Sequence, residues 1–284
     1  MKFTIQLPPT QKASTIRELL ENEWLVPRKV RHFLRTRKDV SLNGEVAMFH
    51  QVATAGDTIS LHLEENDYSY QEVLPGNAPN IQVLFEDEHL IIVNKALGVK
   101  THPNQPDEND TLLNDLTAYL APKAQRPYVV HRLDKETSGA ILFAKNPFVL
   151  PILGRLLEEK QIYRRYQAVI SGDLAKDCTI NQKIGRDRHD RRKRIVDPRN
   201  GQVAITHVEV ARHAKKQSQV YCVLDTGRTH QIRVHLKSIG HPIIGDPLYG
   251  TTPNKRLMLH AFEMYFIHPF TKEKMHVQAL PSLF

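Results

Sequence analysis

In the amino-terminal part of the chain, two segments have apolar residues at helical spacing, and two others alternate between apolar and polar residues. Segments 16–20 and 30–34 place apolar side chains at helical intervals. Segments 40–42 and 58–63 alternate like strands, and each adjoins a turn that contains glycine. The pattern predicts a small α/β unit within the first 65 residues.

Strands dominate after an acidic, proline-containing stretch at residues 64–80. Strands are expected in runs of apolar and β-branched residues, namely 83–85, 90–93, 129–130, 140–144, 162–170, 204–210 and 220–224. One helix is expected after Asn146-Pro147, a capping residue followed by a first-turn proline. Helices interspersed irregularly among strands predict the α+β class, with a mixed, mostly antiparallel sheet.

Composition narrows the class of protein. The 284 residues contain 40% hydrophobic and 25% charged residues, which is ordinary for a soluble globular protein. No run approaches 18 apolar residues, and the first residues lack the apolar core of a signal peptide. Only two cysteines occur, without CxxC spacing, which argues against a disulfide scaffold and a cysteine zinc site. We therefore expect a cytoplasmic protein.

The net charge of +8 is clustered rather than spread evenly. Segment 28–38 holds six basic residues, among them Arg31 and Arg35, and no acid. Segment 186–194 holds six more, including Arg186, Arg188 and Arg192, and reads as a mobile basic loop between strands. A solvated helix face and a loop without a partner are the plain interpretations. In a chain with a pI near 9.4, both segments also suit an RNA backbone.

Two further segments are dense in chemically active side chains. The first is HRLDKETSG at residues 131–139, a loop between apolar strands, where catalytic groups often lie. Its local composition alone favours a surface turn in which Asp134 forms weak ion pairs.

The second dense segment, residues 226–242, predicts a helix with a cationic face. Its buried stripe is Ile232, Leu236 and Ile239, and its cations are His230, Arg233 and Lys237. Thr229 is the expected N-cap, with Gly240 and Pro242 ending the helix. Such a face either binds phosphate, holds a carboxylate or is simply solvated.

Common cofactor and hydrolase motifs are absent from the sequence. There is no phosphate-binding loop, dinucleotide fingerprint, HExxH or GxSxG. The 15 histidines show no ligand spacing, so we expect no metal.

Taken together, these segments resemble the RluA-type pseudouridine synthases. HRLDKETSG resembles that family's HRLDxxTSG, and GRTHQIRVHL followed by GHPIIGDPLYG resembles its later signature. The first residues resemble an S4 RNA-binding domain. The resemblance implies an S4-like domain at 1–66, a linker at 67–80 and a catalytic domain at 81–284.

The resemblance implies a chemistry as well as a fold. Such enzymes isomerise a uridine within RNA, so no cofactor or metal is required. By this match Asp134 is the catalytic nucleophile, Arg233 its ionic partner, and Tyr166 the active-site tyrosine, whereas Tyr163 lies on the opposite strand face.

The resemblance also implies how RNA is held. The target uridine must leave its stack, and Arg132 is expected to occupy the vacated space. Arg228 and His230 are further substrate-binding residues. RNA-backbone contacts are expected from Arg31, Arg35, Arg186, Arg188 and Arg192. The expected partner is rRNA or tRNA, with neither DNA nor a membrane, and the expected state is a monomer.

Two other functions compete with this interpretation. One is a catalytically silent RNA-binding or ribosome assembly factor on the same fold. The intact set of Asp134, Tyr166 and Arg233 argues against it. The other is a metal-dependent nuclease, which a chelator would inactivate. One departure from the family pattern is Lys95-Ala96-Leu97-Gly98, where the family usually has a proline after the lysine.

Overall fold

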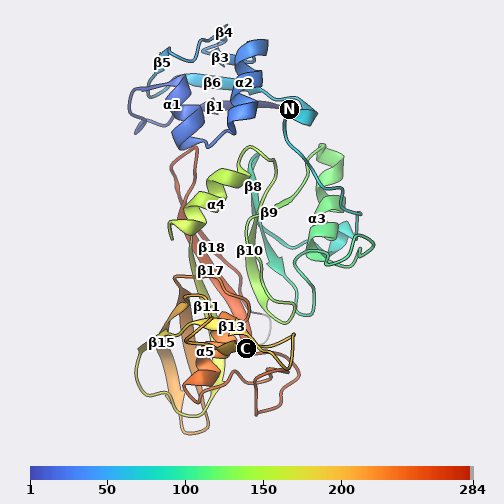
Figure 1. Cartoon of the computed structure of the whole chain (residues 1–284), viewed down its shortest axis with the longest axis vertical. Helices are drawn as coiled ribbons and strands as arrows, with labels where there is room; N and C mark the ends of the chain where they lie inside the picture. Colours follow the sequence, from blue (N-terminus) through green and yellow to red (C-terminus); the bar gives the residue numbers. More distant parts are fainter. Residues whose placement is uncertain (282–284) are drawn as a thin grey trace.

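The computed structural model describes residues 1–281, and its amino-terminal part is a small sheet covered by helices (Figure 1). The sheet order is β1-β6-β3-β4, with bounds Lys2–Gln6, Thr58–His62, Val40–Leu42 and Glu45–Val46. A separate two-stranded pair joins β2 (Ser14–Thr15) and β5 (Val52–Ala53). The helices are α1 (Ile16–Glu18), a π-helical turn at Leu19–Glu23 and α2 (Arg28–Arg37). The predicted helices and strands of this part are present.

A ten-stranded sheet is the centre of the rest of the molecule. Its main path runs β12-β15-β16-β11-β17-β10-β8-β7, with β18 beside β17 and β9 beside β10. Within residues 1–281, only β10 and β17 pair in parallel, so the predicted mixed, mostly antiparallel sheet is confirmed. The bounds are β7 Val83–Glu86, β8 Leu90–Lys95, β9 Tyr128–Val129, β10 Ser138–Ala144, β11 Tyr163–Ser171, β12 Cys178–Asn181, β15 Ile205–Ala214, β16 Gln217–Leu224, β17 Leu259–Ile267 and β18 Lys274–Gln278.

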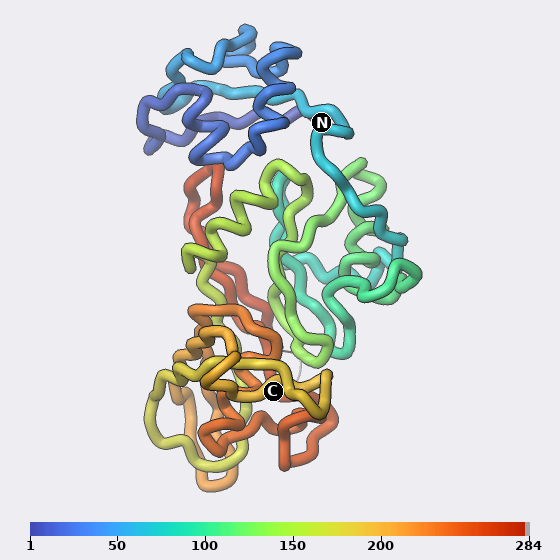
Figure 2. Tube along the Cα trace, in the orientation of Figure 1, coloured from blue at the N-terminus to red at the C-terminus, as the bar shows by residue number. Residues whose placement is uncertain are grey.

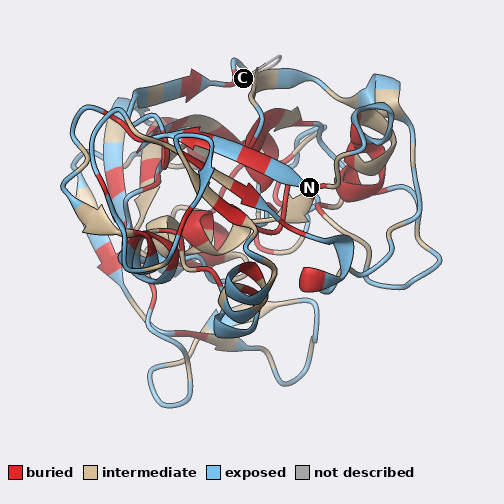
Figure 3. Ribbon diagram, turned by 90° about the horizontal axis from the view of Figure 1, so that it is seen from above, coloured by how far each residue is buried: buried red, intermediate tan, exposed pale blue. Residues whose placement is uncertain are grey.

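The central strands are continuously apolar because both faces of the sheet are covered. In β10, Leu142 packs into a core shared with the amino-terminal unit, and Phe143 packs into a second core on the other face. All seven residues of β10 are buried. Figure 3 shows buried residues gathered where the layers meet and exposed residues along the loops. Burial on both faces explains why these strands lack the polar alternation of a half-exposed sheet.

Helices and short turns complete the larger part. The α-helices are α3 (Leu112–Leu120), α4 (Leu150–Glu158) and α5 (Gln231–Ser238), and 3₁₀ turns occur at Glu65–Asp67, Ala78–Asn80 and Ala121–Lys123. The helix expected directly after Asn146-Pro147 begins later, at Leu150, because the Asn146 side chain caps a preceding turn by accepting from the Val149 N–H at 2.9 Å. Within residues 1–281, no helix is long and apolar enough to cross a bilayer.

The basic segment 186–194 is the tip of a β-hairpin. Strands β13 (Ile184–Arg186) and β14 (Arg194–Val196) pair antiparallel, so the cations between them project from an anchored ribbon.

The chain path in Figure 2 shows the amino-terminal unit next to one end of the larger part, and aromatic rings join the two. Phe3 stacks on Phe148 with 5.4 Å between ring centroids, and Trp24 meets the same ring edge-on at 5.8 Å. Phe270 stacks on the far side of Phe148 at 5.8 Å. All four side chains are buried. The two parts therefore share one apolar core rather than meeting only through residues 64–80.

Candidate active site

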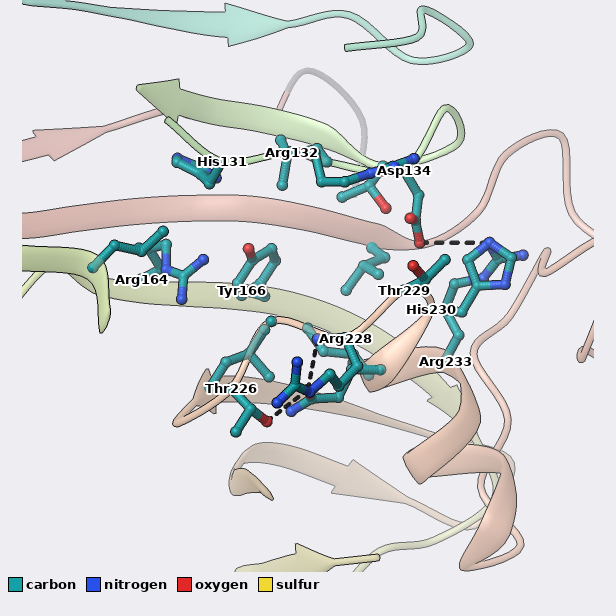
Figure 4. A pocket seen from close by; sticks show the side chains of 18 of the residues that line it. His131, Arg132, Asp134, Arg164, Tyr166, Thr226, Arg228, Thr229, His230 and Arg233 are labelled. Atoms are coloured by element: carbon teal, nitrogen blue, oxygen red, sulfur yellow. Dashed lines mark hydrogen bonds and ion pairs between the residues drawn. The ribbon is translucent and has the colours of Figure 1, made fainter. Parts of the chain in front are cut away.

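The segments singled out in the sequence meet at one cavity of about 470 Å³. Its walls come from the loop before β10, the end of α4, strand β11, the turn after β16 and the start of α5 (Figure 4). They hold Asp134, Tyr166 and Arg233, together with Arg132, Arg228 and His230. The fold thus gathers into one cavity all the residues for which catalysis or substrate binding was expected, although they lie between positions 132 and 233 of the sequence.

The loop that carries Asp134 is held rigidly from below. Lys95 is fully buried, and its ammonium group donates to the carbonyl oxygens of Ala96, Val99 and Lys135 at 2.6–3.1 Å. Burial lowers the pKa of Lys95 to about 8. The Thr101 hydroxyl donates to the Leu133 carbonyl at 2.8 Å. These contacts fix the loop backbone on both sides of Asp134.

A glycine lets the same loop continue into the sheet. Gly139 has a φ of 114°, and a Cβ there would lie 2.2 Å from the carbonyl oxygen of Ala261. Only glycine permits both this backbone conformation and the close approach of β10 to β17. The glycine that ends the TSG tripeptide is therefore required by the backbone of the loop and by its contact with β17.

Asp134 faces an arginine and a histidine across the cavity. Its Oδ2 lies 3.7 Å from Nη1 of Arg233 and 3.9 Å from Nε2 of His230. The Asp134 side chain is 18% exposed, so the carboxylate remains open to the cavity. Arg233 orients this carboxylate, which is open to a substrate in the cavity, as a nucleophile must be.

Arg233 has a stronger partner that the sequence did not reveal, Asp246. Nε and Nη2 of Arg233 donate to the two carboxylate oxygens of Asp246 at 2.8 and 2.7 Å, and both side chains are almost completely buried. Burial opposes ionisation of Asp246, but Arg233 and the backbone N–H groups of Leu248 and Tyr249 hold its pKa below the usual value. This pair fixes the guanidinium so that Nη1 faces Asp134.

The start of α5 differs from the prediction. The N-cap is His230, with a φ of 58°, and not Thr229. The side-chain oxygen of Gln231 accepts from the Arg228 N–H and the Thr226 hydroxyl, at 3.0 and 2.8 Å, and so holds the turn that precedes the helix. The left-handed residue turns the His230 ring into the cavity instead of along the helix face.

Tyr249 connects His230 to the basic hairpin. Its hydroxyl accepts from the Arg194 N–H at 2.7 Å and lies 2.8 Å from Nδ1 of His230. Its ring lies 5.1 Å from the Arg233 guanidinium carbon. Burial lowers the pKa of His230. The GDPLYG segment resembles the family's later signature, but the sequence did not show that its Asp246 and Tyr249 support Arg233 and His230.

Tyr166 lies on β11 and lines the cavity, and it is 5% exposed. Tyr163 lies on the exposed face of the same strand at 39%. Burial raises the pKa of Tyr166, so its hydroxyl is protonated at neutral pH. Sequence reasoning assigned no role to Arg164, which also lines the cavity. The strand alternation that favoured Tyr166 over Tyr163 also predicts that Arg164, two positions before Tyr166, lies on the same face of the strand.

The residues expected to contact the RNA backbone lie outside this cavity. Arg31 and Arg35 are on α2, and Arg31 forms an ion pair with Glu21. Arg186 ends β13, and Arg188 and Arg192 follow in the hairpin connection, where Arg192 pairs with Asp190 at 2.9 Å. The structure brings together the residues expected to act in catalysis and substrate binding, and it leaves these five outside the cavity, on α2 and on the hairpin.

The fold resembles solved pseudouridylate synthase domains. Human RNA pseudouridylate synthase domain containing 1 superposes with a TM-score of 0.60 at 28% identity, covering 73% of this chain and 86% of that one. The human domain containing 4 gives a TM-score of 0.59 at 24% identity, covering 71% and 89%.

Sequence comparisons agree with the structural ones. The RNA pseudouridylate synthase family profile matches residues 89–238, and the profile of the RluD ribosomal pseudouridine synthase N-terminal domain matches residues 3–59. The chain is 41% identical over 251 residues to the uncharacterized RNA pseudouridine synthase YhcT of Bacillus subtilis, covering 86% of this chain and 82% of that protein. It is 38% identical over 250 residues to the ribosomal large subunit pseudouridine synthase D of Nitrosomonas europaea, covering 82% and 71%.

The chain belongs to the RNA pseudouridine synthase family, whose members are isomerases that act on RNA. The resemblance to RluA-type enzymes drawn from the motifs is thereby confirmed.

Proposed function

We propose that this enzyme converts uridines of large-subunit ribosomal RNA into pseudouridine, with Asp134 as the nucleophile. The observation that carries the proposal is the open carboxylate of Asp134, which faces Arg233 and His230 in a cavity of about 470 Å³. The ribosomal substrate is suggested by relatives named ribosomal large subunit pseudouridine synthase D. Transfer RNA is the second candidate substrate.

The reaction rearranges bonds without an oxidant or consumed water. The bond between C1′ and N1 of the uridine breaks, a bond between C1′ and C5 forms, the C5 proton leaves and N1 gains a proton. Asp134 attacks either C1′ of the ribose or C6 of the base, and both routes place it against the same nucleotide. Tyr166 lies beneath the base and assists removal of the C5 proton.

Binding requires that the nucleotide leave its stack. Flipping costs a few kcal/mol, and Arg132 at the exposed rim of the cavity is suited to fill the vacated space. Arg228 is anchored by donation from Nε to the Val203 carbonyl at 3.1 Å and presents the rest of its guanidinium at the same rim. His230 contacts the substrate beside Asp134.

The remaining surface extends the contact with RNA. Residues 1–66 act as an S4-like RNA-binding domain through Arg31 and Arg35, residues 67–80 link it to the catalytic domain at 81–284, and the hairpin cations contact phosphates. Because one chain supplies every wall of the cavity, the enzyme works as a monomer. A ribosomal RNA substrate places it in the cytoplasm.

The test uses transcripts of large-subunit rRNA and of tRNA that carry tritium at uridine C5. Incubation with the enzyme is expected to release tritium to solvent from the ribosomal transcript without cutting the chain. Release from tRNA alone would change the substrate assignment. No release from either pool would favour a catalytically silent RNA-binding protein, and chelator-sensitive chain cleavage would favour a nuclease.

A further inference from the structure

Arg164 is an arginine of the cavity to which the reaction above gives no role. It lies on β11 two positions before Tyr166, and alternate residues of a strand point to the same face. Both side chains line the cavity, and Figure 4 shows them side by side on the strand. Arg164 is therefore held at the floor of the pocket by the same element that positions Tyr166.

The charge of Arg164 is not compensated by the protein. Among residues 1–281 no carboxylate pairs with it, and its Nε is buried without a hydrogen-bond partner. Arg165, one position later on the opposite face, pairs with Glu209 and Glu263 and lies over the Tyr221 ring. A half-buried cation without a counterion is costly, which indicates that a ligand completes its surroundings.

The position of Arg164 identifies the part of the ligand that it meets. In Figure 4, Asp134 and Arg164 lie at opposite ends of the cavity with Tyr166 between them. A uridine whose ribose is at Asp134 extends its base across Tyr166, and O4 is the ring substituent farthest from the glycosidic bond. We propose that Arg164 donates a hydrogen bond to O4 of the flipped uracil and so selects uracil in the pocket. This inference rests on the proposed function.

The chemistry of the bases gives this contact two consequences. O4 of uracil only accepts hydrogen bonds, whereas cytosine carries an amino donor at the same place, so an arginine there favours uracil and opposes cytosine. When the C1′–N1 bond breaks, its electron pair stays with the base, and negative charge spreads to the carbonyl oxygens. A guanidinium at O4 stabilises that charge as it develops. Arg164 is then a specificity-determining residue that also serves the reaction.

The experiment measures single-turnover pseudouridine formation on short RNAs that contain the target position as uridine, 2-thiouridine or 4-thiouridine. Sulfur at position 4 weakens the acceptor that Arg164 is proposed to contact, and sulfur at position 2 does not. We expect the native enzyme to be slower on 4-thiouridine than on 2-thiouridine. Arg164→Gln should be roughly 10- to 100-fold slower than the native enzyme on uridine and show no further loss on 4-thiouridine. Arg164→Lys should recover part of the rate.

Arg165→Gln is the matched control, because it removes an arginine from the same strand outside the cavity. It should behave like the native enzyme on all three RNAs. Equal losses of Arg164→Gln on all three RNAs, or a change confined to RNA affinity and its salt dependence, would overturn the contact with O4. A native enzyme inactive on every RNA would instead overturn the proposed function itself.

Discussion

Two basic helices of this enzyme use their charge in opposite ways. Helix α2 displays cations to solvent, and its arginines find partners mostly near the surface, as Arg31 does with Glu21. Helix α5 buries Arg233 completely against Asp246 and directs it at Asp134. Basic residues on the two helices therefore give a charged surface in one case and the electrostatics of a pocket in the other.

The ion pairs of the two helices therefore differ in how much they contribute to stability. An exposed ion pair contributes about 0–1 kcal/mol, and salt screens it. Removing one member of a buried pair costs about 3–5 kcal/mol, because the remaining charge stays in a poorly solvated place. Substitutions on α5 and its supports should therefore affect folding and catalysis together, whereas those on α2 should affect RNA affinity alone.

The largest expected effect comes from Asp134→Asn. The substitution keeps the shape of the side chain but removes the carboxylate that we propose as the nucleophile, so tritium release should fall by at least about 10³-fold. RNA affinity, measured by filter binding, should change less than about threefold. Retained activity in this variant would show that Asp134 is not the nucleophile.

The next effect should come from Asp246→Asn, which touches no substrate. The variant leaves Arg233 without its bidentate partner, so the free energy of unfolding should fall by about 3–5 kcal/mol in urea titrations. Tritium release should fall as well, because Nη1 is no longer held toward Asp134. Asp190→Asn, which breaks the exposed pair with Arg192, is the control and should be nearly neutral. Equal decreases in the free energy of unfolding of the two variants would show that the buried pair contributes no more to stability than the exposed one.

A pH effect should arise at the contact between the two parts of the molecule. Burial against Phe3 and Phe270 lowers the pKa of His89 to about 4. Between this value and the ordinary 6.5, the unfolded chain binds more protons than the folded one. The free energy of unfolding should therefore fall as the pH drops from about 6.5 to 4, with a contribution from His89 of up to about 3 kcal/mol.

The control for the pH effect is His89→Phe, which keeps an aromatic ring in the contact but cannot titrate. Denaturant titrations at several pH values should show a smaller decrease for this variant than for the native chain. Identical pH profiles would show that protonation of His89 does not weaken the contact.

The smallest effect is expected from Arg35→Ala on α2. If Arg35 contacts one phosphate, the variant should bind RNA a few-fold more weakly, and the slope of log affinity against log salt should decrease by about one. Pseudouridine formation at saturating RNA should be unchanged. Lys216→Ala, an exposed substitution at the turn between β15 and β16, serves as the reference. An equal change in both variants would mean that α2 has no particular role in binding.

Most elements could be predicted because their signals are local. The alternation in 58–63 and the apolar run in 140–144 both proved to be strands, β6 and β10. Errors occurred where side-chain hydrogen bonds near the start of a helix decided the backbone. His230 and not Thr229 is the N-cap of α5, with Gln231 accepting from the Arg228 N–H just before the helix, and Asn146 capped a turn before α4 rather than the helix itself. Where a helix begins depends on which of several competing hydrogen bonds forms, and the spacing of residue types does not show which one is the most stable.

The sequence alone determined the family and the nature of the chemistry, because catalytic groups must appear as particular residue types in short ordered motifs. HRLDKETSG and THQIR named Asp134 and Arg233 as candidates without a structure. Only the tertiary structure decided which cations are buried, which are paired and which face the cavity. It alone revealed Asp246 behind Arg233 and the uncompensated charge of Arg164. The physical reason is that the energy of a charge depends on its solvent and its neighbours, which the folded chain brings from distant segments.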